Sequence, residues 1–278
     1  MKYTIVLILI LSAFSSSAFT LRLIPKDARH TFGMGIVTPD KPSRMTVIYL
    51  HGIGERGNGS IPSLTKLNNW AGINLKGDSQ SLFAAADHFG FNIICVQTIH
   101  DFEKGEIPYA VSYAIDSLNT LKDQVHLLSF SLGGFGAARE FGKDPDLPRK
   151  FASLVFVAMG PGTIENTARN IAESKTPVWF FTSSDDTKSG TNPDVPRNLY
   201  RDIKALGGNA WLTEWKSGGH LILGRVCSAW YTKKGQPGNR HLCSEEDALG
   251  MNTPAHPVFI WMQNNPKTGK PKAPDAVF

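Results

Sequence analysis

Short runs of consecutive apolar residues recur along the chain and alternate with segments whose apolar residues repeat at helical spacing. The runs are 45–50, 91–97, 125–130, 151–159, 177–182 and 210–215. Apolar character on successive positions is typical of strands that are buried on both faces of a parallel sheet. These runs therefore predict the strands of a mostly parallel central sheet.

The segments between and after these runs have the spacing of amphipathic helices. They are 81–90, 110–121, 134–143, 164–175, 195–208 and 257–265. Alternation of strands and helices predicts an α/β fold with helices on both faces of the sheet. No linker-like composition divides the chain, so residues 19–278 are predicted to form a single domain.

The first 18 residues differ from the rest. Lys2 precedes the apolar stretch "YTIVLILILSAF", and the small residues Ser16 and Ala18 stand at the −3 and −1 positions of a cut after Ala18. This pattern predicts a secretory signal peptide, and hence a secreted or periplasmic protein. The alternative is a membrane anchor, but a spanning helix needs about 20 apolar residues.

The charge of the chain is mildly basic. The 278 residues carry a formal net charge of +5, and removal of Lys2 with the leader leaves 28 − 24 = +4. The Lys and Arg residues form no concentrated face and no RNA-binding signature, so nucleic acid is not an expected partner. Nothing predicts a stable membrane association after cleavage of the leader.

Ser131 is the first candidate for chemistry. It stands in "SFSLG", directly after the run 125–130 and directly before the helical segment 134–143. This is a variant of the nucleophile elbow G-x-S-x-G, in which the serine occupies a sharp, strained turn between a strand and a helix. Such a turn needs small residues two positions before and after it, and Ser129 and Gly133 meet that need.

A nucleophilic serine also needs a base and an acid that orients the base. Asp185 and Asp186 follow the run 177–182, and Asp186 is favoured as the acid, although either is also compatible with an ordinary loop aspartate. His220 follows the run 210–215 after two glycines. It completes the order Ser…Asp…His, with each member at the carboxyl end of a strand. We therefore predict catalytic roles for Ser131, Asp186 and His220.

The loop "YLHGIGERG" (49–57) is the candidate oxyanion loop. Its glycines allow the backbone N–H of Ile53 to act as one donor, with the N–H of Leu132 as the second. A plain strand-to-loop turn is the alternative. His51 is expected to brace this loop and not to act as the base, because it precedes the first helix.

These motifs resemble those of the α/β-hydrolase family. More narrowly, "LHGIGERG", "SFSLGGFGA" and "GGH" resemble secreted esterases related to feruloyl esterases and polyhydroxyalkanoate depolymerases. The resemblance implies that Ser131 is the nucleophile, Asp186 the acid and His220 the base. Ser183 departs from the glycine that is common in the acid loop. Glu55 and Arg56 match the "GER" of the oxyanion loop, where an ion pair between them, or a solvated surface pair, is expected.

The function implied is hydrolysis of carboxylic esters through an acyl-enzyme, with small-molecule or polymer-linked esters as substrates. No cofactor and no metal are called for, since no Cys–His cluster has zinc-ligand spacing. One alternative is a serine peptidase of the same fold, for which an added propeller or cap domain would be expected. The other is a non-catalytic binding module, which a missing Ser, Asp or His would favour.

The acyl and alcohol groups of the substrate cannot be deduced from the sequence, and Trp70, Trp179 and Trp230 fit either the core or a pocket. Cys95 lies in an apolar run and is expected to be a buried hydrophobe. Cys227 and Cys243 flank a polar, Gly-rich loop, so a disulfide is expected to pin a flap within residues 225–253 beside His220. The alternative is that residues 225–253 form a surface excursion far from the chemistry.

Overall fold

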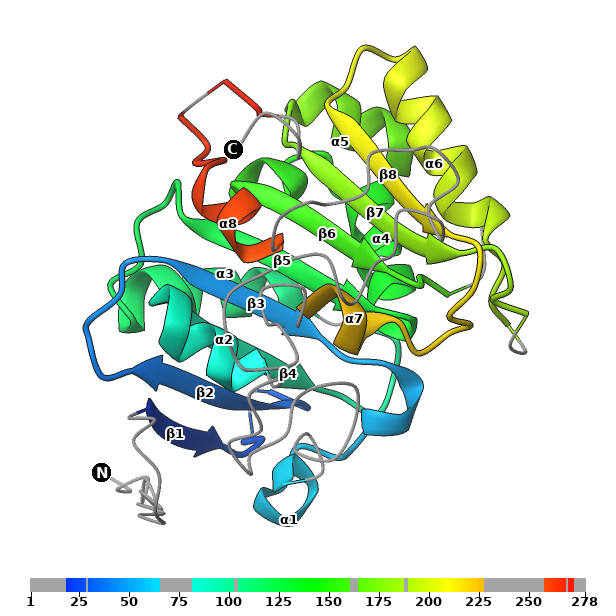
Figure 1. Cartoon of the computed structure of the whole chain (residues 1–278). Helices are drawn as coiled ribbons and strands as arrows, with labels where there is room; N and C mark the ends of the chain where they lie inside the picture. Colours follow the sequence, from blue (N-terminus) through cyan, green and yellow to red (C-terminus); the bar gives the residue numbers. More distant parts are fainter. Residues whose placement is uncertain are drawn as a thin grey trace, which may run out of the picture.

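The computed structural model describes residues 19–28, 30–65, 82–102, 105–160, 165–187, 190–227, 258–268 and 270–272. Eight strands form one sheet in the order β1-β2-β4-β3-β5-β6-β7-β8 (Figure 1). The strands are β1 (Phe19–Ile24), β2 (Gly33–Pro39), β3 (Thr46–Leu50), β4 (Asn92–Gln97), β5 (Val125–Phe130), β6 (Ser153–Val157), β7 (Val178–Ser183) and β8 (Ala210–Trp215). The pairs from β4 to β8 are parallel, whereas β1 and β2 pair antiparallel at one edge.

Helices cover both faces of this sheet. They are α1 (Ile61–Leu64), α2 (Leu82–Phe89), α3 (Glu106–Ser117), α4 (Leu132–Lys143), α5 (Thr167–Ser174), α6 (Asp194–Ala205), α7 (Leu223–Cys227) and α8 (Val258–Gln263), with short 3-10 turns at Ile53–Glu55 and Pro148–Lys150. Buried residues of α2, α7 and α8 join one core cluster, and those of α3 to α6 join the other. The mostly parallel α/β sheet predicted from the sequence is therefore confirmed.

Alternate residues of a strand pack against the helices of opposite faces of the sheet, because successive side chains point to opposite faces. In β3, Val47 and Tyr49 pack with α2, α7 and α8, whereas Ile48 and Leu50 pack with the helices of the other face. The central strands are apolar on successive positions because both faces are covered.

The predicted strand runs all contain strands, but β1 and β2 were not predicted. β1 has partly polar, half-buried positions in "FTLRLI", and β2 contains two glycines and ends at Pro39. Partial exposure is typical of a strand at the edge of a sheet, as β1 is, whereas β2 is buried between β1 and β4 and its glycines interrupt the apolar run. The leader 1–18 lies outside the described residues, and the single-domain prediction for 19–278 stays a prediction.

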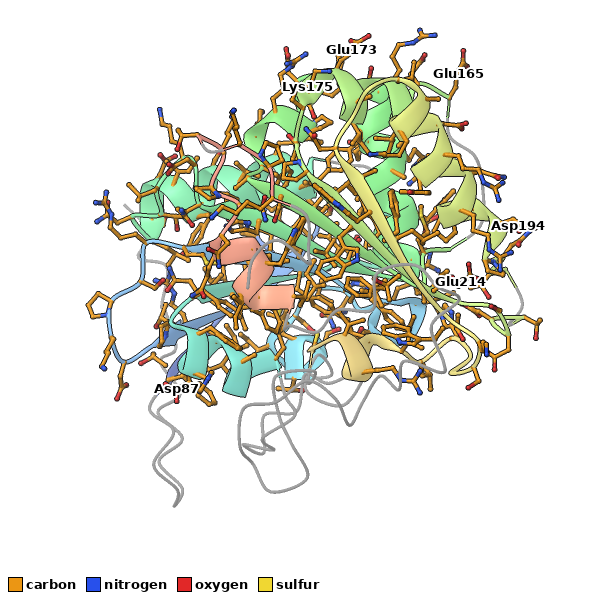
Figure 2. The ribbon with its side chains drawn as sticks, turned by 45° about the horizontal axis from the view of Figure 1, so that its top comes forward. Asp87, Glu165, Glu173, Lys175, Asp194 and Glu214 are labelled. Atoms are coloured by element: carbon orange, nitrogen blue, oxygen red, sulfur yellow. The ribbon has the colours of Figure 1, made fainter. Side chains whose placement is uncertain are left out.

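The helix α6 is tied to the edge strand β8 by a charged cluster. Arg197 donates hydrogen bonds to Asp194 on its own helix and to Glu214 of β8. Figure 2 labels the two acidic side chains, which lie at the right of that view. The side chain of Ser184 also donates to Glu214, at 2.9 Å. The cluster therefore joins α6, β8 and the loop that follows β7.

Candidate active site

The turn at Ser131 is strained and depends on close backbone approach. Ser131 directly follows β5 and precedes α4, with φ 52° and ψ −113°. A left-handed φ is costly for a residue that bears a Cβ, so the surroundings must hold it. The N–H of Ser131 donates to the carbonyl of Val157, at 3.0 Å. A Cβ on Gly133 would lie 2.2 Å from the carbonyl oxygen of Leu50, so helix and strand can meet there only at a glycine.

Three side chains from the carboxyl ends of β5, β7 and β8 meet in one hydrogen-bonded chain. Nε2 of His220 lies 2.8 Å from Oγ of Ser131, and Nδ1 of His220 lies 2.9 Å from Oδ2 of Asp186. A carboxylate accepts, so Nδ1 carries the proton and Nε2 is free to accept the proton of Ser131. The structure thus brings together Ser131, Asp186 and His220.

Neighbouring side chains hold the imidazole of His220 and the carboxylate of Asp186 in their orientations. The ring of Phe130 lies against the imidazole of His220 with centroids 5.2 Å apart. Thr191 donates its hydroxyl to Oδ1 of Asp186 at 2.7 Å, so both carboxylate oxygens are engaged. Thr191 was not predicted from the sequence, because a threonine in a polar loop has no pattern that marks such a contact.

The two neighbouring aspartates make different contacts. Asp186 is buried and contacts the imidazole, whereas Asp185 is exposed and accepts the N–H groups of Gly218 and Gly219. Ser183, which stands where the resemblance would place a glycine, donates its hydroxyl to Asp185. Among these contacts, only that of Asp186 reaches the imidazole.

The expected oxyanion donors lie on either side of Ser131. Leu132 is the first residue of α4, and the first N–H groups of a helix have no acceptor within the helix. Ile53 begins the 3-10 turn after Gly52, and a Cβ added at Gly52 would lie 3.6 Å from the Cβ of Ser131. Within the described residues, no acceptor bonds the N–H of Ile53 or of Leu132.

His51 braces the oxyanion loop. It is fully buried, its Nδ1 lies 2.7 Å from the carbonyl of Gly52, and its Nε2 accepts the N–H of Thr98 at 3.3 Å. Burial lowers the pKa of His51 to about 4, so the ring is neutral at neutral pH. The neutral tautomer with its proton on Nδ1 satisfies both contacts, and the bracing role is confirmed.

The expected ion pair between Glu55 and Arg56 is wrong. Glu55 is buried, and its Oε2 accepts the N–H of Gly52 and the hydroxyl of Tyr49, each at 3.1 Å. Burial raises the pKa of Glu55 to about 8, so the carboxyl is largely neutral at neutral pH. Arg56 points the other way and pairs with Asp101. The adjacent side chains diverge because the backbone turns between them, a geometry that the local sequence does not specify.

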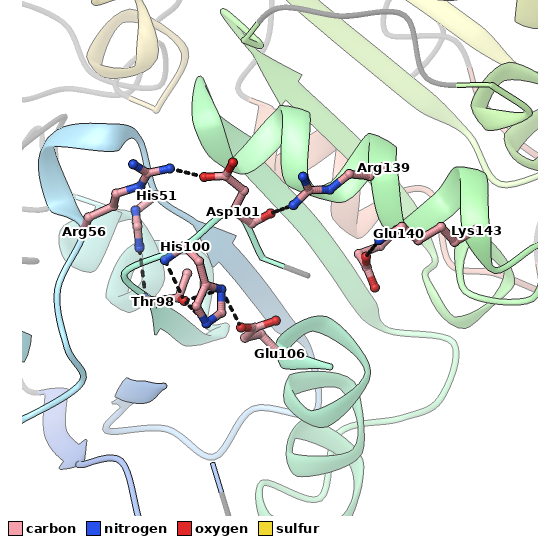
Figure 3. A network of polar contacts seen from close by, with 9 residues as sticks. All are labelled: His51, Arg56, Thr98, His100, Asp101, Glu106, Arg139, Glu140 and Lys143. Carbon is pink, nitrogen blue, oxygen red and sulfur yellow. Dashed lines mark hydrogen bonds and ion pairs between the residues drawn. The ribbon is translucent and has the colours of Figure 1, made fainter. Parts of the chain in front are cut away.

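A polar network joins the oxyanion loop to the loop after β4 (Figure 3). Asp101 accepts from Arg56 through its carboxylate and from Arg139 of α4 through its carbonyl oxygen. In the same loop, His100 lies 3.3 Å from the buried carboxyl of Glu106. The oxyanion loop is therefore held from both β4 and α4.

The described cysteines belong to the core, and the described tryptophans lie in it or pack against it. Cys95 and Trp179 are buried, as expected of core residues. Cys227 is a free, buried thiol at the end of α7, which contradicts the disulfide expected with Cys243. The reason is that α7 directs this thiol into the core cluster beneath the sheet. Cys243, Trp70, Trp230 and residues 228–253 of the expected flap lie outside the described residues.

Metal-binding clusters and membrane-spanning helices are absent from the described part of the chain. There, no group of three or more His, Cys, Asp or Glu side chains has an arrangement that could hold a metal ion. In those same segments, no helix has both the length and the apolar character that crossing a membrane requires.

Known structures share this architecture. An α/β hydrolase, MGS-M1, from a Medee basin deep-sea metagenome library matches with a TM-score of 0.52 and 11% identity, over 73% of this chain and 84% of that one. A sugar hydrolase from Lactococcus lactis matches with a TM-score of 0.53 and 14% identity, over 81% of this chain and 92% of that one. This protein has an α/β-hydrolase fold.

A thermostable esterase matches less well, with a TM-score of 0.49 and 17% identity over 72% of this chain. The chain spans 55% of that esterase's length. No protein-family model and no curated protein sequence matches the chain. At these identities the similarity concerns the α/β-hydrolase fold, and the narrower resemblance to feruloyl esterases and polyhydroxyalkanoate depolymerases stays a prediction.

Proposed function

We propose that the protein is a secreted serine hydrolase that cleaves carboxylic esters. Ser131 is the nucleophile, His220 the general base and Asp186 the orienting acid. The observation that carries the proposal is the hydrogen-bonded chain from Oγ of Ser131 through His220 to Asp186, at 2.8 and 2.9 Å. An activated nucleophile is recognised by this geometry: a base within reach of the hydroxyl, oriented by a third group.

In this mechanism His220 takes the proton of Ser131 while Oγ attacks the ester carbonyl. The N–H groups of Ile53 and Leu132 donate to the oxyanion that forms, each contributing on the order of 3 kcal/mol to lowering the barrier. The protonated His220 then donates its proton to the departing alcohol, which leaves an acyl-enzyme. Water, deprotonated by His220, attacks this ester, and the acid is released as Ser131 regains its proton.

The functional test compares variants on p-nitrophenyl esters of increasing acyl length. Ser131→Ala should lower kcat on the order of 10⁴-fold or more without changing the unfolding midpoint, because only the nucleophile is lost. Asp186→Asn should also lower kcat strongly, because Asn can hold the wrong tautomer of His220. If Ser131→Ala kept a tenth of the wild-type kcat, the nucleophile would be another residue.

The same panel addresses the substrate class. Feruloylated and acetylated xylan run beside the chromogenic esters test the polymer-linked substrates that the resemblance implies. A matched p-nitroanilide tests the peptidase alternative, which would be favoured if the wild type cleaved the anilide measurably and Ser131→Ala did not, because an enzyme specific for esters leaves the less reactive amide bond intact.

The proposed export is supported by the pattern of residues 1–18. Cleavage after Ala18 would leave the edge strand intact. Mass spectrometry of exported protein should find a chain that begins at or near Phe19. An intact Met1 on a membrane-bound form would show that the leader is an anchor.

A further inference from the structure

The loop that carries His220 leaves the sheet where its backbone pairing ends. The β7–β8 ladder runs as far as Ser183 opposite Trp215, and the N–H of Ser184 still donates to the carbonyl of Trp215 at 2.8 Å. Beyond that point come Gly218 and Gly219, with φ of 140° and 58°. Glycine loses more conformational entropy on folding than other residues. The loop therefore needs contacts beyond the backbone ladder to hold its conformation.

The carboxylate of Asp185 supplies acceptors for this loop. Its Oδ1 accepts the N–H of Gly219 at 2.8 Å, and its Oδ2 accepts the N–H of Gly218 at 3.3 Å. One side chain therefore engages the two backbone groups that directly precede His220. Charge-assisted bonds of this kind are stronger than bonds between neutral groups.

The carboxylate is itself held in place. The hydroxyl of Ser183 donates to Oδ1 of Asp185, and the N–H of Thr187 donates to the carbonyl of Asp185. The hydroxyl of Ser183 and the N–H of Gly219 lower the pKa of Asp185, so the group is ionised at neutral pH. The acceptor is thus oriented and charged.

We propose that Asp185 is the positioning residue for the catalytic histidine, fastening the backbone of Gly218 and Gly219 so that His220 stays between Ser131 and Asp186. The inference rests on the proposed function. The two neighbouring aspartates then have different roles. Asp186 orients the imidazole of His220 through Nδ1, and Asp185 orients the backbone that carries His220. A small displacement of a catalytic group lowers the rate of the reaction, because the base must stay within hydrogen-bonding distance of the nucleophile.

The experiment uses Asp185→Ala and Asp185→Asn in the full chain, with Asp202→Ala, an exposed aspartate of α6, as the matched control. With p-nitrophenyl acetate, Asp185→Ala should lower kcat by about 10- to 100-fold, the scale of a slight misplacement. KM should stay within about twofold, since the side chain acts on the loop and not on the substrate. Asp185→Asn keeps one amide oxygen as an acceptor and should recover a large part of kcat. Asp202→Ala should match the wild type.

A second readout does not depend on catalysis. Hydrogen–deuterium exchange of a peptide covering residues 216–222 should show Gly218 and Gly219 exchanging about tenfold faster in Asp185→Ala, with partial protection restored in Asp185→Asn. If kcat of Asp185→Ala stayed within twofold of the wild type, or exchange at 218 and 219 did not change, the positioning role would be wrong. If the wild type hydrolysed no ester, the proposed function would fail, and the exchange experiment alone would decide the role of Asp185.

Discussion

Two loops at the carboxyl edge of the sheet frame Ser131, and they are restrained in opposite ways. The oxyanion loop, residues 51–57, is held by His51 and Glu55, both buried and both largely neutral at neutral pH. The histidine loop, residues 216–222, is held from the surface by the ionised carboxylate of Asp185. The oxyanion loop is anchored mostly in the core, with the part-exposed pair of Arg56 and Asp101 as the exception. The histidine loop joins the core at Ile222, whereas its glycines are held where water competes for the same groups.

The difference predicts how each loop fails. Disturbing the oxyanion loop exposes or crowds buried polar groups, which are expensive to leave unsatisfied, so stability should fall along with activity. Loosening the histidine loop returns exposed N–H groups to water, so activity should fall while stability changes little. Single substitutions in each loop test this contrast.

The largest effect on stability is expected from Gly57→Ala. A Cβ at this position would lie 1.9 Å from Oγ of Ser63 and 2.6 Å from Cδ of Gln97. The Gln97 amide donates to the carbonyls of Glu55 and Ser63, so its displacement breaks buried hydrogen bonds. The free energy of unfolding should fall by about 3 kcal/mol, at the upper end of the range for overpacking. Urea denaturation followed by circular dichroism measures it.

The matched control lies in the other loop. Gly219→Ala meets no atom within 4 Å and carries only the penalty of φ 58°, so its loss of stability should be about 1 kcal/mol. Equal losses in the two alanine variants would remove the contrast between a core loop and a surface loop.

A smaller effect, on how the free energy of unfolding depends on pH, is expected from Glu55→Gln. The folded pKa of Glu55 is raised to about 8, so the folded state keeps a proton that the unfolded state releases. The stability of the wild type therefore falls as pH rises from the ordinary Glu range through 8, by about 1.4 kcal/mol per pH unit where the difference is complete. Gln can accept the same bonds without a proton to lose. Between pH 6 and 8 the wild type should lose on the order of 2 kcal/mol relative to this variant.

Urea denaturation of both proteins at each pH gives the comparison, with Glu165→Gln, an exposed carboxyl, as the control. Parallel pH profiles of the wild type and Glu55→Gln would mean that Glu55 is ionised in the fold, and that the oxyanion loop rests on charge as the histidine loop does.

Much of the site could be predicted because its members follow apolar strands. Ser131 and His220 are each marked by a preceding strand run and nearby glycines, and the parallel fold brings the carboxyl ends of those strands to one edge. The choice of Asp186 over Asp185 agrees with the contacts, yet the sequence shows only two adjacent carboxylates. Which one turns inward depends on a single backbone turn that is stabilised by tertiary contacts.

Other features could not be predicted from local patterns. The partners of Glu55 and Arg56 are Tyr49 and Asp101, the second of which comes from a different loop. The edge strand β1 is only half-buried, and the apolar run of the buried strand β2 is interrupted by two glycines, so neither has the continuous apolar character that marked the others. Cys227 was paired with Cys243 on spacing and compartment, but the direction in which α7 carries its thiol is a property of packing.

The order of strands in the sheet has a consequence for how the site assembles. From β5 to β8, neighbours in the sheet are also neighbours in the sequence, whereas β3 lies between β4 and β5 and pairs with both. Pairings between sequence neighbours close shorter loops and form sooner than those that bring distant segments together. The half that carries Ser131, Asp186 and His220 can thus form as a continuous series of right-handed crossovers. The loop of Ile53 reaches Ser131 only when β3 docks against β5, so we expect the nucleophile and its base to meet during folding before the site can stabilise an oxyanion.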